Sequence, residues 1–145
     1  MRLDYQAYPA PWAPGGLVYR PVVDLQIYGP TGQFSSSALA DTGSDVTLVT
    51  DLVAPTLGVA LGPEEMIRGI AGQQLPVRFG EVELELRGPA EVFQWRARVA
   101  FYPGMIDFLG HDGFFDLFHA GFDNHRRALT IRPHRGVAVL RRPLP

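Results

Sequence analysis

Residues 37–49 read Ser-Ala-Leu-Ala-Asp-Thr-Gly-Ser-Asp-Val-Thr-Leu-Val, and this stretch organises the rest of the chain. Small and apolar residues lead to Asp41, and the alternating residues Val46 and Leu48 follow the Asp-Thr-Gly-Ser segment. This pattern predicts two strands joined by a tight loop that carries the Asp41 carboxylate at its tip. A carboxylate between apolar strands is costly unless hydrogen bonds or a second group hold it, so Asp41 is a candidate for chemistry.

Alternating apolar and polar residues predict strands on both sides of this loop. Val23, Leu25 and Ile27 alternate with polar residues in the best example. The predicted elements are strands at residues 17–28, 33–40 and 46–50, a turn at 29–32, and one or two helical turns at 51–58.

Downstream of the loop, residues 65–86 are predicted to form a long hairpin with Gly69-Ile70-Ala71-Gly72 at its tip. Glutamates at positions 81, 83 and 85 alternate with apolar residues, which predicts one buried face and one solvated, acidic face. A turn at 87–90 and a further strand at 92–101 follow.

The segment Phe108-Leu109-Gly110 precedes a change of spacing. Residues 111–120 are predicted to form a helix, because their large apolar residues fall on one helical face. Asp112 would cap the start of this helix and Gly121 would end it. A hairpin over residues 122–131 is expected next.

The two ends of the chain are predicted to lie outside the domain at residues 17–132. Residues 1–16 are proline-rich and predict an irregular arm, either a surface segment held by Trp12 or an arm that packs on a partner subunit. Residues 133–145 form a basic tail that is either solvated or docked. Its apolar run at residues 137–140 would suit pairing with a two-fold mate.

Three of these motifs together resemble the retropepsin-like family, the single-domain aspartic proteases of retroviral type. They are the Asp-Thr-Gly loop at Asp41, the glycine-rich hairpin tip at residues 69–72, and Phe108-Leu109-Gly110. The resemblance spans residues 17–132 and implies an all-β fold: a closed β-barrel like half of pepsin, with a flap hairpin and one short C-terminal helix. Each motif alone is common in unrelated chains, but their order is not.

The resemblance implies a role for each residue of the loop. Asp41 would be the catalytic residue, Thr42 would cross the two-fold axis to the partner loop, and Gly43 would let a substrate carbonyl or amide approach. Ser44 would donate a hydrogen bond to the outer oxygen of Asp41, which favours the ionised carboxylate and a more acidic optimum. Asp45 would hold the substrate main chain.

Beyond the loop, the resemblance assigns substrate binding to Gly69, Ile70, Ala71 and Gly72, with Ile70 closing an apolar pocket from the flap. Phe108, Leu109 and Gly110 would form a strand that passes beneath the loop.

A Cβ on Gly110 would collide with the loop above it. Retroviral relatives carry Arg after this glycine, whereas this chain carries His111. We hypothesise that protonated His111 pairs with Asp45; the alternative is a partly exposed histidine without a partner.

Composition excludes several other classes of function. The net charge is −2 and there is no cysteine, so neither nucleic-acid binding nor a thiolate site is expected. The four histidines lack the spacing of a zinc site, and we predict no metal and no cofactor. Without an apolar span or signal core, a cytoplasmic protein with no membrane contact is expected.

The sequence therefore predicts an aspartic endopeptidase. Such catalysis requires two carboxylates that share one proton, and the chain carries a single Asp-Thr-Gly, so a homodimer is expected. Its substrate would be a peptide or an unfolded protein, cleaved in extended, apolar-rich segments. The alternative is a catalytically silent module that binds peptides or dimerises with the same fold.

Overall fold

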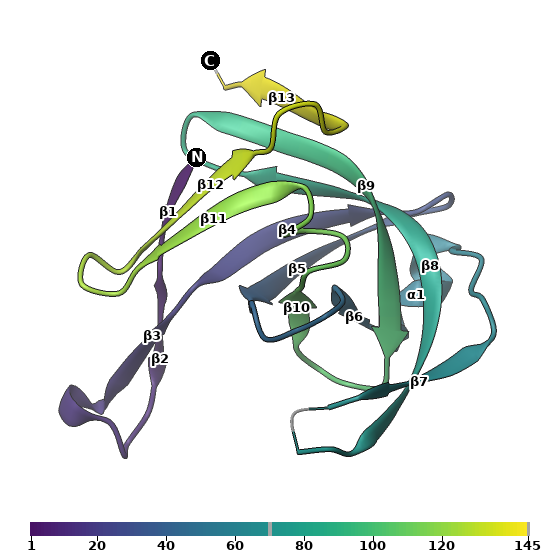
Figure 1. The fold of residues 1–145 in the computed structure, drawn as a ribbon, viewed down its shortest axis with the longest axis horizontal. Coiled ribbons are helices and arrows are strands. Elements are labelled where there is room, and N and C mark those ends of the chain that lie inside the picture. The colour runs from purple at the N-terminus through teal and green to yellow at the C-terminus, as the bar shows by residue number, and fades with distance from the viewer. Residues whose placement is uncertain (70, 145) are drawn as a thin grey trace.

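The computed structural model describes residues 1–69 and 71–144, and most of these residues lie in strands (Figure 1). The strands are β1 (Arg2–Asp4), β2 (Gln6–Pro9), β3 (Leu17–Arg20), β4 (Val22–Tyr28), β5 (Gln33–Ala40), β6 (Leu48–Thr50), β7 (Glu64–Arg68), β8 (Gln74–Arg87), β9 (Glu91–Tyr102), β10 (Asp107–Leu109), β11 (Phe118–Asp123), β12 (Ala128–Pro133) and β13 (Val139–Pro143). The helical segments are the 3₁₀ turns η1 (Pro14–Gly16) and η2 (Asp51–Val53) and the α-helix α1 (Ala54–Leu57).

The main sheet closes on itself. Its strands follow the order β9, β6, β10, β5, β4, β8, and β8 pairs again with β9 through ten residues from Arg78 to Arg87. β6 runs parallel to β9, and β10 runs parallel to β5. The predicted all-β class and closed barrel are therefore confirmed, because these pairings leave no open edge around the ring.

Alternation along β8 fills the interior of this barrel. Val82, Leu84 and Leu86 are buried, as their spacing predicts, and they pack in one core with Phe93 and Trp95 of β9. Full burial of a leucine side chain contributes about 2 kcal/mol, so this face alone strongly favours the observed register.

The helical turns predicted at residues 51–58 are confirmed as η2 and α1. Gly58 ends α1 in the left-handed region at φ 67°, where glycine lacks the usual steric penalty. Within the described residues, no helix is long and apolar enough to cross a membrane.

The helix predicted over residues 111–120, and with it a C-terminal helix, is wrong. Residues 111–117 form turns and β11 begins at Phe118. Gly113 has φ +91°, which no right-handed helix accepts, and its carbonyl accepts a hydrogen bond from Trp95 Nε1 at 2.9 Å. Phe114 and Phe118 pack on the Trp95 ring, so the helix-like spacing serves a compact turn.

The irregular N-terminal arm is also a wrong prediction. β1 pairs with β12, and β2 and β3 form a hairpin that projects from the barrel (Figure 1). Trp12 does not hold the segment to the surface, because 79% of it is exposed. Met1, Leu3 and Tyr5 pack on the core. Their spacing at every second position indicates a strand, but the nearby prolines favoured the interpretation as an irregular segment.

The C-terminal tail carries β13, which pairs with β9 of the same chain and lies at the edge of the sheet. This docking explains why Glu85 is buried, although it lies on the face of β8 that was predicted to be solvated. Only 6% of Glu85 is exposed, and it forms ion pairs with Arg87 at 3.2 Å and with Arg142 of β13 at 3.1 Å.

Candidate active site

Three adjacent strands hold the Asp41 loop. β5 ends at Ala40 and β6 begins at Leu48, and β10 lies between these two strands in the sheet. The loop over residues 41–47 must therefore cross the end of β10. The small residues Ala38 and Ala40, which precede Asp41 on β5, are buried in the core.

Backbone hydrogen bonds fasten the loop to the segment at residues 109–112. Asp41 N–H donates to the Leu109 carbonyl at 3.0 Å, and His111 N–H donates to the Ser44 carbonyl at 2.9 Å. Two further bonds join Asp112 to the loop, one to the Asp45 carbonyl at 2.9 Å and one from Thr47 N–H at 3.0 Å. Four bonds to one short segment give the loop a single conformation.

Gly110 lies where this crossing is tightest. A Cβ on Gly110 would lie 2.2 Å from the Val46 carbonyl oxygen and 2.7 Å from the Ser44 carbonyl oxygen. Both contacts are with backbone, which cannot rotate away. The sequence-based steric argument for glycine beneath the loop therefore agrees with the geometry.

The Asp41 carboxylate is half-buried at the loop tip. Its Oδ1 accepts a hydrogen bond from Gly43 N–H at 2.9 Å, and its backbone carbonyl accepts one from Ser44 N–H at 3.1 Å. Thr42, Gly43 and Asp45 are exposed. The loop thus presents one oriented carboxylate together with an uncovered polar surface that a second protein surface or a ligand can reach.

The predicted bond from Ser44 to Asp41 is absent from the described residues. Ser44 Oγ instead donates to the Val46 carbonyl at 2.7 Å. A short loop leaves that carbonyl without a strand partner at this point, and the nearby hydroxyl satisfies it. The described residues therefore give no support to a more acidic optimum arising from Ser44.

The hypothesis that His111 pairs with Asp45 also fails in the described residues. His111 Nε2 lies 2.8 Å from the Thr42 carbonyl oxygen, and since a carbonyl can only accept, the ring nitrogen donates. No ion pair within 4.0 Å joins His111 to Asp45 in that part of the chain. The imidazole instead anchors the exposed side of the loop.

The predicted flap corresponds to the hairpin of β7 and β8. Gly69 N–H donates to the Gln73 carbonyl at 2.8 Å, and Ala71 N–H donates to Gln73 Oε1 at 3.0 Å. Gly72 has φ +79°, which explains a glycine at this turn. The role predicted for Ile70 lies outside the described residues.

A small apolar cluster connects the loop to the flap hairpin. Leu48, Val77, Ala100 and Tyr102 are its buried members, and the partly buried side chains packed on it include Val46, Ile67 and Phe108. These last three come from the exit of the loop, from β7 and from β10. Phe108 is therefore placed beside the site, whereas Leu109 is fully buried beneath it.

Sequence reasoning missed Asp107, which is only 4% exposed. Its Oδ1 accepts a hydrogen bond from Thr50 N–H at 2.8 Å, and its Oδ2 accepts one from Ser36 Oγ. One carboxyl thus ties together β10, β6 and β5, the three strands that carry the loop. Burial raises the pKa of Asp107 above its ordinary value of 3.8, although both hydrogen bonds act to lower it.

A signal for Asp107 was present in the sequence. Residues 107 and 109 fall on the same face of a strand, and an apolar residue at position 109 favours burial of that face. An acidic residue on a buried face needs donors, so alternation alone identifies Asp107 as a structural carboxyl.

Comparison with known proteins finds a similarity in structure but none in family or curated sequence. No protein-family model and no curated protein matches the chain. A solved structure of the EIAV protease, complexed with the inhibitor HBY-793, is similar with a TM-score of 0.48 and 20% sequence identity. The match covers 63% of this chain and 82% of that chain. The case for a function therefore rests on the geometry around Asp41.

Proposed function

We propose that the chain is a retropepsin-like aspartic endopeptidase that acts as a homodimer. The observation that carries this proposal is the Asp41 carboxylate, which an Asp-Thr-Gly loop holds at its tip by the bond from Gly43 N–H. The loop is bonded along its length to the strand end beneath it, so the carboxylate is preorganised. The exposed Thr42 and Gly43 leave the adjoining surface open for a partner.

Two carboxylates are required, and each chain supplies one. Two carboxyl groups about 3 Å apart cannot both ionise, so they share one proton and titrate as a pair. A two-fold axis beside the loop would bring Asp41 against the Asp41 of a second copy, since a two-fold interface repeats the same surface on both subunits. Activity is then a property of the dimer.

The chemistry follows from this shared proton. The ionised carboxylate takes a proton from water as the water oxygen bonds to the peptide carbonyl carbon, and the neutral carboxyl gives its proton to the carbonyl oxygen. When the tetrahedral intermediate collapses, the C–N bond breaks and the nitrogen receives the proton taken from water. The carbonyl reforms and returns the other proton to its carboxylate, which restores the pair.

Apolar-rich extended peptides are the proposed substrates. Val46, Ile67 and Phe108 offer partly buried apolar surface beside the loop, from three different elements. A peptide lying between the loop and the flap hairpin in extended form would place alternate side chains on such surface. Its main-chain groups would bond to backbone and to Asp45.

Digestion of an unfolded reporter protein tests the proposal. We expect wild-type protein to cleave with an acidic optimum in a scan from about pH 3 to about pH 8, and Asp41→Asn to reduce the rate by at least about 100-fold. Asp4→Asn is the matched control, because Asp4 is exposed in β1, and it should retain full activity.

Sedimentation velocity on the same samples shows whether the protein is dimeric, which is needed to interpret an absence of cleavage. A folded, dimeric wild-type protein that cleaves nothing at any pH would contradict the proposal and favour the silent peptide-binding module. Cleavage that survives Asp41→Asn would locate the activity elsewhere, in the chain or in a contaminant.

A further inference from the structure

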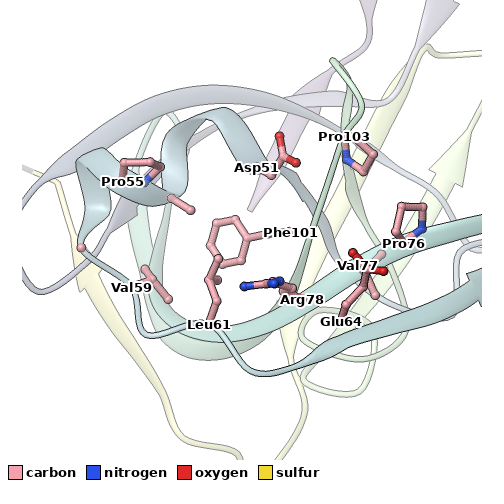
Figure 2. Close-up of a pocket in the computed structure, with 12 residues that line it drawn as sticks. Asp51, Pro55, Val59, Leu61, Glu64, Pro76, Val77, Arg78, Phe101 and Pro103 are labelled. Carbon is pink, nitrogen blue, oxygen red and sulfur yellow. The ribbon is translucent and has the colours of Figure 1, made fainter.

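A hollow of about 730 Å³ lies away from the Asp41 loop, between α1, the flap hairpin and the end of β9 (Figure 2). It is lined by Asp51, Ala54, Pro55, Gly58, Val59, Leu61, Glu64, Pro76, Val77, Arg78, Phe101 and Pro103. None of residues 41–47 takes part in this lining. Its volume falls in the range of pockets that bind small molecules, so the hollow is large enough for a small molecule or a short peptide.

The floor of the hollow is apolar and well ordered by packing. Phe101 is 2% exposed and Val77 is 1% exposed, so both belong to the packed interior and only their edges reach the hollow. Prolines at positions 55, 76 and 103 stiffen three parts of the wall. A preformed apolar floor favours an apolar side chain.

Charged side chains of both signs stand around this floor. Asp51 follows β6, Glu64 begins β7 and Arg78 lies on β8. In the described part of the chain, none of the three has an ion-pair partner within 4.0 Å. In the view of Figure 2, the Phe101 ring lies between the Asp51 carboxylate and the Arg78 guanidinium.

We propose that this hollow binds a free apolar amino acid or short apolar peptide with both termini uncapped. Its carboxylate would bond to Arg78, its ammonium to Asp51, and an apolar side chain would lie against the partly exposed Val59 and Leu61 beside Phe101. A simple anion would satisfy Arg78 but meet two carboxylates, and a simple cation would leave Arg78 unpaired. A zwitterion brings an anionic group to Arg78 and a cationic group to the two carboxylates, of which Glu64 lies opposite Arg78 in the pairing of β7 with β8. Guanidinium and carboxylate match in a planar, two-bond geometry.

The hollow is lined both by the base of the β7–β8 hairpin and by the body of the barrel. Glu64, Pro76, Val77 and Arg78 belong to the flap hairpin, whereas Asp51 belongs to the body. A bound zwitterion would join them and restrain the flap base. Repeated cleavage by an endopeptidase releases short peptides with both termini free, so the site would sense product; this link rests on the proposed function, whereas binding itself does not.

The binding experiment uses the full chain carrying Asp41→Asn, so that its result does not depend on turnover. The probe is the dipeptide Leu-Phe, followed by amide chemical shifts, with N-acetyl-Leu-Phe and Leu-Phe-amide as capped forms. We expect saturable amide shifts at residues 59–62, 64, 77 and 78. We also expect about tenfold weaker binding for each capped form, because each cap removes one charge-assisted interaction.

Two variants test which side chain binds each charged terminus of the peptide. Arg132→Gln is the control, because Arg132 is exposed and outside the hollow. Arg78→Gln should bind Leu-Phe about tenfold more weakly and should no longer distinguish it from Leu-Phe-amide. Asp51→Asn should likewise lose discrimination against the acetylated form. Arg132→Gln should behave like the parent protein.

Three results would overturn the inference: no saturable binding of Leu-Phe, equal affinity for all three peptides, or shifts confined to residues 41–46. The third would place the peptide at the Asp41 loop and leave the proposed function standing. If a variant fails to fold, the capped series on the parent protein still decides. Binding at the hollow without any hydrolysis by wild-type protein would separate the two proposals.

Discussion

Gly110 packs beneath the Asp41 loop with no room for a side chain. The oxygen that a Cβ would meet at 2.2 Å is the carbonyl of Val46, at the exit of the loop. To relieve the clash of an added Cβ, either the loop or β10 would have to move, and backbone hydrogen bonds hold both in place. Any substitution at Gly110 therefore acts on the position of Asp41 as well as on stability.

We predict that Gly110→Ala lowers the free energy of unfolding by about 1–3 kcal/mol, the usual cost of overpacking a close contact. Urea unfolding measures it. Gly62→Ala is the control, because a Cβ there would meet its nearest atom at an ordinary 3.5 Å. An equal effect of the two substitutions would show that loss of glycine itself, and not the crossing, is responsible.

Asp107 predicts a pH dependence of stability. Burial raises its pKa above 3.8 in the folded chain, so the folded state binds this proton more tightly than the unfolded state. The contribution of Asp107 to stability is then fully present below its unfolded pKa and is lost as the pH rises through the folded pKa. In Asp107→Asn this titration is absent.

We therefore expect wild-type stability to fall relative to Asp107→Asn as the pH rises from about 3.5 to about 6.5. Urea unfolding of both proteins at each pH measures the difference, in which the other acidic groups cancel. A difference that grows in favour of wild type as the pH rises would mean that the Ser36 and Thr50 hydrogen bonds outweigh burial.

At the scale of elements, β13 covers an acidic side chain of the barrel wall. Arg142 of β13 pairs with Glu85 at 3.1 Å, and Arg141 pairs with Glu91 at the start of β9. The strand is short and lies at the edge of its sheet. Its docking therefore depends on these pairs together with one row of backbone hydrogen bonds.

We predict that Arg142→Gln lowers the protection of β13 amides from hydrogen exchange about two- to five-fold, the effect of losing one partly exposed ion pair. Hydrogen exchange with mass spectrometry measures it. Arg132→Gln should leave β13 protection unchanged. Unchanged protection in Arg142→Gln would mean that backbone pairing with β9 alone holds the strand.

At the scale of the whole molecule, the proposed activity belongs to two chains rather than one. A chain with Asp41→Asn folds around the same loop contacts but brings no ionisable group to the shared site. In a mixture of wild-type and variant chains, only dimers with two wild-type chains would carry the complete pair. The activity of such mixtures, measured against the fraction of Asp41→Asn chains, therefore reports how many chains form one active site.

We predict that wild-type protein refolded with an equal amount of Asp41→Asn retains about one quarter of the activity of wild type at the same total concentration, since random pairing sets the fraction of complete dimers. The fluorescence of a cleavable reporter measures the rate. Retention of one half would indicate a catalytic unit of one chain and would contradict the dimer.

The sequence by itself determined the features that depend on neighbouring residues. Alternation and apolar runs predicted the strands β4, β5, β8 and β9, and turn residues placed the hairpins between them, whereas the closed barrel was implied by the family resemblance. The strand-loop-strand pattern also identified the Asp41 loop, whereas the need for Gly110 followed from the resemblance, which implies a strand that crosses beneath the loop. Local propensity decides the strands, the turns and the loop before any tertiary contact forms.

Only the tertiary structure decided how distant segments share polar groups. The helix-like spacing at residues 111–120 became a turn because Gly113 bonds to Trp95, far away in sequence. Glu85 is buried because β13 docks beside it, and His111 bonds to Thr42 rather than to Asp45. The hollow at Phe101 likewise combines residues 51–64, 76–78 and 101–103. These hydrogen bonds and ion pairs join segments that are distant in sequence, so they depend on how the whole chain folds and no local pattern encodes them.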